Sequence, residues 1–458
     1  MFVSTNSLSG NRRLVNLSIK KYFNLSVDRR VREGYGILMD VAFYPLHNPV
    51  KHYAWGSTER IARFQHRRFP TPQPEAEVWM GAHPSDSSML QIAGRRCSLW
   101  QAVADNPEYW LGSQVARDFD RQFPFLLKIL AAEKALSIQV HPTRDQAERG
   151  FRFEEQHAVP HDAPHRIYRD RNHKPEQMVA LSEFQAMCGF RTGSAIAQRM
   201  RPLHRYTSVS GRDEQALQEL WSVLEMISSD TDGIGSFFRT LMALQTDHPA
   251  AAAALLHGGV QAASAELAEI DAFAAAWVRR LSRQFPDDPG ALAPLYLNTV
   301  SIYPGEALTL AAGIPHAYLD GLGVEVMANS DNVIRAGLTV KHIDVPSLVD
   351  TVRCRSFVPD TAGPQPVADG VEQYPQVFRE FALFRLTTGP VRITRDAGCA
   401  GRGPRILLAD SDAQLRIVDT QGRWEDISGG SAVVIPHATE EFRLQGTGCG
   451  YLATAGAV

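Results

Sequence analysis

Residues 136–142 read LSIQVHP and bring together side chains that could bind a metal ion. In an extended strand, Ser137, Gln139 and His141 point to one face, while the aliphatic residues between them point to the other. An amide oxygen and an imidazole two residues apart are donors that suit Zn²⁺. The same alternation also occurs in strands that merely show a polar face to water. This stretch therefore leaves both interpretations open, and further ligands must come from elsewhere in the chain.

A second polar segment, Asn172-His173-Lys174-Pro175-Glu176, precedes the apolar stretch 177–181, which has the pattern of a strand. Proline fixes its own φ and pushes the residue before it towards extended geometry. Glu176 is therefore presented from a stiff segment, and its carboxylate is a candidate functional group.

The longest polar run in an apolar setting follows Gly313-Ile314-Pro315-His316, within the sequence GLGVEVMANSDNVIRAGLTVKHID. Charged and amide side chains alternate there with aliphatic ones, which is typical of a lined cavity, although a solvated loop would also accommodate them. The polar residues of this run are Glu325, Asn329, Ser330, Asp331, Asn332, Arg335 and Lys341.

Lys128 interrupts the apolar run FPFLLKIL at residues 123–130. A lysine in a strand of this kind must reach a partner or a ligand anion, or extend its ammonium group to the surface from a strand edge. The other histidines are less informative. We expect the loop residues His157, His161 and His165 to be solvated, and His437 of the Pro436-His437-Ala438 sequence to be structural.

Hydrophobic periodicity divides the chain into strand-rich and helical parts. Apolar residues recur at helical spacing between about 195 and 290, whereas short alternating runs separated by Pro and Gly dominate elsewhere and are typical of small antiparallel barrels. A short helix after His141 is expected to end at Gly150. The expected units are a basic, disordered extension (1–38), a β-rich domain that contains the candidate site residues (39–195 and 291–350), a helical insertion (196–290) and a C-terminal β domain without metal (351–458).

The composition excludes several classes of function. The 458 residues are 44% hydrophobic and 21% charged with a net charge of −3, which gives no sign of a nucleic-acid or anionic-membrane partner and favours a small-molecule ligand. No stretch approaches the roughly 18 apolar residues of a membrane span. Five scattered cysteines favour reduced thiols and a cytoplasmic protein. The basic leader faintly resembles an organelle transit peptide, but a disordered terminus with the fold beginning at Met39 is the simpler interpretation.

The motifs SIQVHP, NHKPE and GIPHAYLDGLGVEVMANSDNVIRAGLT together resemble the type I phosphomannose isomerases. The similarity is close from about residue 41 to 350, where it includes YAWGS, AEVWMGAHP, FLLKIL and CGFR, and is looser beyond. It implies a mainly β, double-cupin fold with an α-helical insertion, one catalytic Zn²⁺, a sugar phosphate as substrate, and a chain expected to be monomeric.

The resemblance also implies roles for individual residues. Gln139, His141, Glu176 and His316 would be the zinc ligands, and Arg335 would be the catalytic arginine. The remaining pocket residues would be Ser137, Lys128, Lys174, Glu325, Asp331 and Lys341, with Tyr53 and Trp55 at the rim. Two departures stand out: Val340 replaces a proline that the family usually has before Lys341, and the basic leader has no counterpart.

The implied reaction is the interconversion of an aldose and a ketose phosphate, in which a proton leaves C2 and returns at C1. The general base must be a carboxylate, a neutral lysine or a metal-bound hydroxide, and the sequence does not choose among Glu325, Asp331 and Lys174. Lys128 and Lys341 are the candidates for holding the phosphate.

Four other functions are alternatives to the isomerase. An iron-dependent cupin oxygenase would usually have two histidines and a carboxylate, whereas Gln139 as a fourth donor favours zinc. A non-catalytic sugar-binding protein or an isomerase of another phosphorylated sugar remains an alternative. A nucleotidyltransferase would need a glycine-rich phosphate-binding loop, and the sequence has none near its start.

Overall fold

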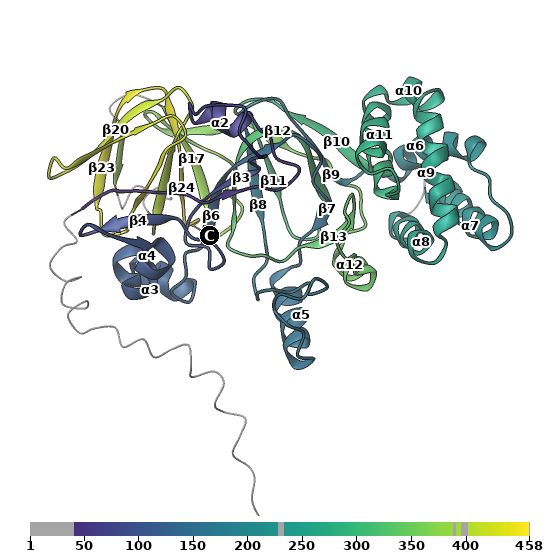
Figure 1. The fold of residues 1–458 in the computed structure, drawn as a ribbon, viewed down its shortest axis with the longest axis horizontal. Helices are drawn as coiled ribbons and strands as arrows, with labels where there is room; N and C mark the ends of the chain where they lie inside the picture. Colours follow the sequence, from purple (N-terminus) through teal and green to yellow (C-terminus); the bar gives the residue numbers. More distant parts are fainter. Residues whose placement is uncertain (1–40, 228–232, 388–390, 395–401, 458) are drawn as a thin grey trace, which may run out of the picture.

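The computed structural model describes residues 41–227, 233–387, 391–394 and 402–457. The expected N-terminal extension and the junction at Met39 lie outside these residues. Figure 1 shows three parts side by side: the C-terminal sheets at the left, the sheet that carries the SIQVHP, NHKPE and GIPHAY motifs in the centre, and a group of helices at the right. This arrangement of sheets with a helical insertion agrees with the expected fold class. No helix in the described ranges is long and apolar enough to cross a membrane.

The central, 11-stranded sheet follows the order β14-β11-β8-β12-β6-β3-β2, with β7, β9, β10 and β13 paired beside this path. Its strands are β2 (Val50–Lys51), β3 (Glu77–Met80), β6 (Phe125–Ala132), β7 (Ile138–Val140), β8 (Glu176–Ala180), β9 (Phe184–Phe190), β10 (Leu297–Ile302), β11 (Ala307–Leu310), β12 (His316–Ala328), β13 (Ile334–Gly337) and β14 (Thr361–Ala362).

Strand β12 organises this sheet because it changes partners halfway along its length. Its first part pairs with β7 and β9, and the part after Gly321 pairs with β6 and β8. Gly321 has φ +142°, and a Cβ atom there would lie 2.5 Å from the ring of Phe184. The glycine thus allows the strand to turn between its two sets of partners, so that one strand contributes to both halves of the sheet.

The C-terminal part contains a seven-stranded and a four-stranded sheet, and a separate hairpin lies beside them. The strands of these sheets are β1 (Tyr44–Pro45), β15 (Gln365–Ala368), β16 (Val371–Gln373), β17 (Ala382–Thr387), β18 (Val391–Thr394), β19 (Arg405–Ala409), β20 (Gln414–Asp419), β21 (Trp424–Ser428), β22 (Ala432–Ile435), β23 (Glu441–Thr447) and β24 (Cys449–Thr454), and the hairpin is β4 (Met89–Ile92) with β5 (Arg95–Ser98).

The C-terminal sheets are joined to the part of the protein that contains the central sheet, through residues near the beginning of the chain. Strand β1 pairs with β22, so residues from the N-terminal side complete the C-terminal sheet. One apolar core also contains residues of both parts, among them Ile129, Val326, Leu383 and Ile406. The two parts therefore share buried surface rather than meeting through a thin linker.

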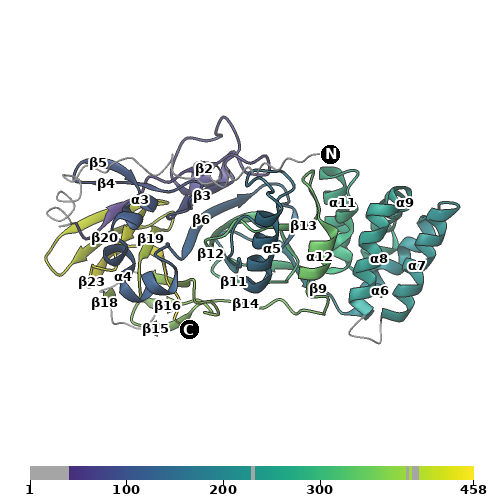
Figure 2. The same ribbon diagram turned by 90° about the horizontal axis from the view of Figure 1, so that it is seen from below.

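The helices support the sheets from several sides, and Figure 2 shows the insertion as a separate layer beyond β9. They are α2 (Arg60–Phe64), α3 (Leu99–Asp105), α4 (Pro107–Asp118), α5 (Arg144–Gln156), α6 (Gly193–Met200), α7 (Arg212–Met226), α8 (Gly233–Asp247), α9 (Pro249–Ala263), α10 (Glu266–Ile270), α11 (Ala272–Gln284) and α12 (Val345–Thr351), with 3₁₀ turns η1 (Arg201–Tyr206) and η3 (Pro289–Leu295).

The helical insertion explains which face of β7 is polar. Ile138 and Val140 are buried in the same apolar core as the helices, together with Ile334 on the neighbouring strand β13. Gln139, between them, is only partly buried. Because side chains alternate along a strand, covering the aliphatic face leaves the polar one for a site on the other side.

The expectation that a helix ends at Gly150 is wrong, because α5 continues to Gln156. The helix begins with a capping box between Thr143 and Gln146, as the sequence pattern favours. Gly150 lies in its interior, where a Cβ atom would lie 2.3 Å from the ring of Tyr168. Close packing, rather than chain termination, accounts for this glycine.

Substitution of Gly112 in α4 would test the contact between α4 and the C-terminal part. Its φ is +75°, and a Cβ atom would lie 2.4 Å from the ring of His437. Gly94, at φ +74°, has open space around it and is the matched control. We expect Gly94→Ala to cost about 1–2 kcal/mol for backbone strain alone, and Gly112→Ala to cost about 1–3 kcal/mol more for overpacking. Chemical denaturation measures both, and equal losses would contradict the contact.

Candidate metal centre and substrate site

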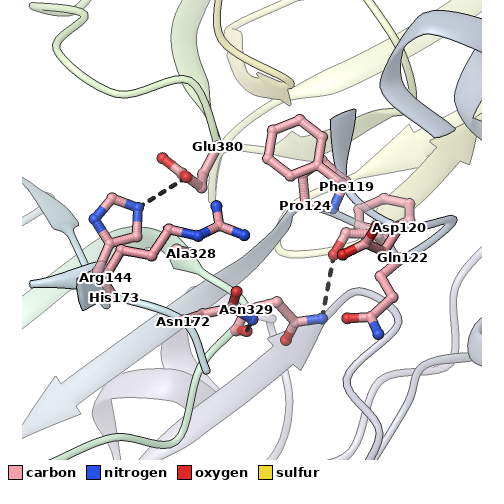
Figure 3. A pocket seen from close by; sticks show the side chains of 11 residues that line it. Phe119, Asp120, Gln122, Pro124, Arg144, Asn172, His173, Ala328, Asn329 and Glu380 are labelled. Carbon is pink, nitrogen blue, oxygen red and sulfur yellow. Dashed lines mark hydrogen bonds and ion pairs between the residues drawn. The ribbon is translucent and has the colours of Figure 1, made fainter. Parts of the chain in front are cut away.

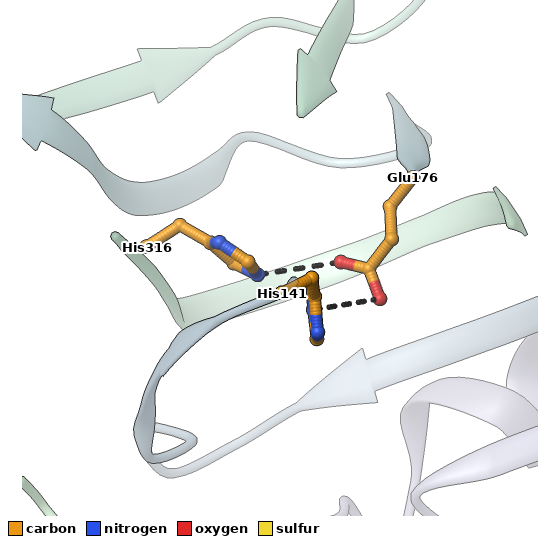
Figure 4. A group of neighbouring side chains, drawn as sticks. All are labelled: His141, Glu176 and His316. Carbon is orange, nitrogen blue, oxygen red and sulfur yellow. Dashed lines mark ion pairs between the residues drawn. The ribbon is translucent and has the colours of Figure 1, made fainter. Parts of the chain in front are cut away.

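Three buried side chains from different strands converge in the central sheet (Figure 4). His141 follows β7, Glu176 begins β8 and His316 begins β12. Their ligand atoms lie within 4.8 Å of one another, and each residue is at most 3% exposed. Within the described ranges this is the one group of three or more His, Cys, Asp or Glu residues that could hold a metal ion. His157, His161, His165 and His437 are not part of it.

Backbone carbonyl groups fix the tautomer of both histidines. His141 Nδ1 donates to the carbonyl oxygen of Asn332 at 2.8 Å, and His316 Nδ1 donates to that of Ile314 at 2.9 Å. Since a carbonyl oxygen only accepts, Nδ1 carries the proton in each neutral ring and Nε2 presents a lone pair.

The two lone pairs face the same carboxylate. His141 Nε2 lies 3.4 Å from Glu176 Oε1, and His316 Nε2 lies 3.3 Å from Glu176 Oε2. His141 Nε2 is buried without a hydrogen-bond partner. Electron pairs directed at one another in a buried space repel unless a cation lies between them, so the donor set fits a metal ion.

The chemistry of this donor set matches zinc. Two imidazole nitrogens and one carboxylate oxygen form a typical catalytic zinc site, which keeps a position open for another oxygen. Gln139 lies opposite His316 in the pairing of β12 with β7, and opposite Arg335 in the pairing of β13 with β7. The sheet therefore places the predicted amide ligand and the predicted catalytic arginine next to the histidines.

Lys174 supplies the positive charge nearest to the cluster. Its Nζ lies 2.9 Å from Glu176 Oε1, and both side chains are buried. Burial alone would raise the pKa of Glu176, but the ammonium group of Lys174 holds that pKa well below its usual range. Glu176 is thus an ionised ligand.

A second buried charge cluster lies on the same side of the sheet. Glu325 is opposite Lys128 on β6 and opposite Met178 on β8, which places it on the face that carries Glu176. Lys128 Nζ donates to Glu325 Oε2 at 2.7 Å and lies 3.5 Å from Glu77 Oε1. Lys128 is 5% exposed, so its ammonium group reaches buried partners and does not extend to the surface.

The two members of this pair have shifted pKa values. Burial is the largest influence on Glu325 and raises its pKa, with a further rise from Glu176, while Lys128 opposes the shift. For Lys128, burial acts to lower the pKa, but Glu325 and Glu77 outweigh it and raise the pKa above its usual value. A carboxyl group whose pKa is raised next to a metal site is suited to proton transfer.

His83 is a buried polar residue beside Asp331, and the sequence analysis assigned it no role. It is 2% exposed, its ring lies 4.8 Å from that of Trp79, and its Nε2 lies 3.5 Å from Asp331 Oδ1. Burial lowers the pKa of His83 to about 4, so its ring is neutral at neutral pH. Its place in AEVWMGAHP was the available signal. The contact with Asp331 could not be predicted, because the two residues are far apart in the sequence.

Of the two predicted rim residues, Tyr53 is exposed and Trp55 is partly buried. Tyr53 is 42% exposed, and its ring stacks on that of Trp55 with a centroid distance of 5.6 Å. Lys341 and Val340 are also exposed. Val340, in place of the proline that the resemblance implies, therefore occupies a solvent-facing position.

A small cavity of about 40 Å³ lies outside the metal cluster, at the junction with the C-terminal part (Figure 3). It contains none of the predicted site residues. His173 Nε2 donates across this junction to Glu380 Oε1 at 2.8 Å. Because His173 directly precedes Lys174, the contact ties the segment that presents Glu176 to the C-terminal part.

Known proteins resemble this chain over most of its length. Residues 43–193 match the model of the catalytic domain of type I phosphomannose isomerase. The mannose-6-phosphate isomerase of Escherichia coli (strain K12) is 39% identical over 338 residues, which are 73% of this chain and 81% of that protein.

Solved structures agree with this similarity. A mutant phosphomannose isomerase from Salmonella typhimurium has a TM-score of 0.79 at 32% identity, and covers 91% of this chain and all of its own. A zinc-bound mannose 6-phosphate isomerase has a TM-score of 0.77 at 32% identity with the same coverage.

Removal of one imidazole should abolish tight zinc binding. We expect zinc-loaded wild-type protein to retain one metal ion per chain after dialysis, and His316→Ala to lose most of it, because a ligand is missing. His157→Ala removes an exposed loop histidine and is the control. Elemental analysis measures zinc, and thermal unfolding shows whether zinc raises the Tm. Equal zinc retention by the two variants would contradict the site.

Proposed function

Because the chain belongs to the type I phosphomannose isomerase family, we propose that it is a zinc-dependent enzyme that interconverts mannose 6-phosphate and fructose 6-phosphate. The observation that supports this proposal most strongly is the pair of fixed Nε2 lone pairs directed at Glu176, next to a second buried carboxyl group with a raised pKa. One group of residues fits a metal and the other fits proton transfer, which are the two requirements of this reaction.

In this proposal Gln139, His141, Glu176 and His316 hold the zinc ion. When bound, zinc acts as a Lewis acid that favours negative charge on nearby substrate oxygens. The backbone carbonyl groups of Asn332 and Ile314 keep both imidazoles in the tautomer that binds a metal.

Glu325 is the group that we assign to proton transfer between C1 and C2. Lys174 Nζ already contacts Glu176 Oε1 at 2.9 Å, so we assign Lys174 to holding this ligand rather than to proton transfer. The carboxylate of Asp331 is 38% exposed, whereas that of Glu325 is 2% exposed and has a raised pKa. Lys174 and Asp331 then remain as neighbours that position the sugar.

The other predicted residues surround the sugar phosphate. Arg335 adds positive charge near the reacting carbons, because its strand pairs next to Gln139. Ser137, Lys341, Tyr53 and Trp55 contact the substrate. Lys128 was expected to bind phosphate, but its ammonium group is already held by Glu325 and Glu77. We therefore assign Lys128 to the stabilisation of ionised Glu325 in the wall of the pocket.

The proposal also includes the domain division, the oligomeric state and the location of the protein. We keep the division into a catalytic cupin domain (39–195 and 291–350), a helical insertion (196–290), a C-terminal cupin-like domain (351–458) and an N-terminal extension (1–38), and a monomeric chain. A cytoplasmic location is supported by the free state of Cys97, Cys188, Cys354 and Cys449 within the described ranges.

A coupled assay tests the proposed activity. We expect mannose 6-phosphate to be converted to fructose 6-phosphate, activity to disappear with a chelator, and zinc to restore it. If zinc-loaded, folded protein has no turnover with mannose 6-phosphate but acts on another phosphorylated sugar, the substrate assignment is wrong. Retention of iron rather than zinc would favour an oxygenase, and sugar binding without turnover would favour a non-catalytic protein.

Replacement of Lys128 tests the assignment of Glu325. Lys128→Met removes the charge that opposes the raised pKa of Glu325, so this pKa should rise further. A base works only when it is deprotonated, and kcat/KM falls as the pH drops through its pKa. The acid limb of the pH profile should therefore move to higher pH in Lys128→Met. Glu325→Gln should lose about 10²- to 10⁴-fold in kcat. An unmoved acid limb in an active, folded Lys128→Met variant would exclude Glu325 as the base.

A further inference from the structure

Three cationic side chains near the metal site have no anionic partner among the residues that the structure describes. Arg169, Arg335 and Lys341 are partly buried or exposed, and among the described residues their side chains make no hydrogen bond or ion pair. Most other charged groups around this site are paired, as the Lys174–Glu176 and Lys128–Glu325 contacts show. Unpaired cations gathered at a ligand site indicate that the ligand supplies the negative charge.

Arg169 is placed beside the metal site by its backbone. Its N–H group donates to Asn332 Oδ1 at 2.7 Å, and its carbonyl oxygen accepts from His161 Nε2 at 2.9 Å. The carbonyl oxygen of the same Asn332 accepts from the ligand His141. A single buried asparagine, Asn332, therefore connects the backbone of Arg169 with the metal centre. It fixes the position of the backbone from which the Arg169 side chain extends.

The neighbouring Asp170 makes this placement rigid. Its carboxylate accepts from the Ser330 hydroxyl at 2.9 Å and from the Asp331 N–H group at 2.7 Å, and the Asn332 side chain donates to its carbonyl oxygen at 2.9 Å. These bonds tie the Arg169 segment to the polar run that leads to Arg335. Arg169 is thus held against this run although it lies more than 160 residues earlier in the chain.

The three cations influence one another electrostatically. Burial lowers the pKa of Arg335, and Arg169 lowers it further. Burial also lowers the pKa of Lys341, followed by Arg335 and then Arg169. Repulsion of this kind is unfavourable in the free protein, and an anion bound among the three groups would relieve it.

We propose that Arg169 binds the phosphate group of the substrate together with Lys341, and that Arg335 lies between this phosphate site and the metal. The inference rests on the proposed isomerase function and adds to it a residue that no motif had indicated. A guanidinium group can donate two parallel hydrogen bonds to phosphate oxygens, so Arg169 distinguishes a phosphate monoester from a free sugar.

Arg171 offers a matched control two residues further along. It is exposed, and its guanidinium group lies 5.3 Å from the ring centroid of Phe151 rather than among the three cations. Arg169→Ala and Arg171→Ala remove the same side chain from the same segment. Arg169→Lys keeps the charge but not the paired hydrogen-bond geometry.

The test compares these variants as zinc-loaded enzymes. We expect Arg169→Ala to raise the KM for mannose 6-phosphate about 10- to 100-fold, with a smaller change in kcat, and to weaken competitive inhibition by inorganic phosphate by a similar factor. Arg169→Lys should recover part of both losses, and Arg171→Ala should behave like the wild type. Zinc content and Tm confirm that each variant is folded and loaded.

Some results would overturn the inference. One is that the KM and the phosphate inhibition constant of Arg169→Ala lie within twofold of those of Arg171→Ala. Another is that Arg169→Ala loses activity only through a lower kcat. If the wild type has no isomerase activity, the proposed function fails instead. Calorimetric titration of inorganic phosphate into wild type and Arg169→Ala then decides the phosphate site separately, and equal affinities would refute it.

Discussion

The site depends on repulsion between the Nε2 lone pairs of two histidines and the carboxylate of Glu176, which the fold holds close together. His141 and His316 are buried, each is held in one tautomer by a backbone carbonyl group, and both direct Nε2 at Glu176. The strands that carry them belong to one sheet, so this repulsion cannot be relieved by a small movement of one side chain. A divalent cation turns the same arrangement into a stable one, and the apolar layer of helices behind β7 keeps its donors pointing inward.

Charge balance around this centre extends well beyond the three ligands. Lys174 and Lys128 neutralise two buried carboxylates, and removal of either partner would leave an uncompensated charge inside the protein. The C-terminal part contributes through Glu380. Its carboxylate accepts a hydrogen bond from His173, the residue before Lys174, and so holds this segment in place. Arg169, Arg335 and Lys341 are different because no anionic side chain in the described part of the chain pairs with them. In the proposed site, paired charges therefore surround the metal ligands and Glu325, and the three cations are assigned to the phosphate.

Local patterns in the sequence predicted the parts that depend on neighbouring residues. The alternation in LSIQVHP gave the correct face for Gln139 and His141, and helical spacing located the insertion, because strand and helix periodicities are properties of short stretches. The predicted end of the helix at Gly150 was wrong because a glycine is needed there for close packing against Tyr168, a residue outside the local pattern. The partner of Lys128, 197 residues away, and the contacts of His83 and Arg169 could not be read from spacing. Such pairings are set by strand register and long-range folding.

Anomalous diffraction at the zinc edge, from crystals grown with zinc, tests the central claim most directly. The account predicts one strong peak, at about 2.0–2.2 Å from His141 Nε2, His316 Nε2 and a carboxylate oxygen of Glu176. It also predicts that both Nδ1 atoms keep their carbonyl partners. A peak bound through Nδ1, a peak at the exposed loop histidines, or no peak between these three side chains would contradict the claim that the buried lone pairs were arranged for zinc.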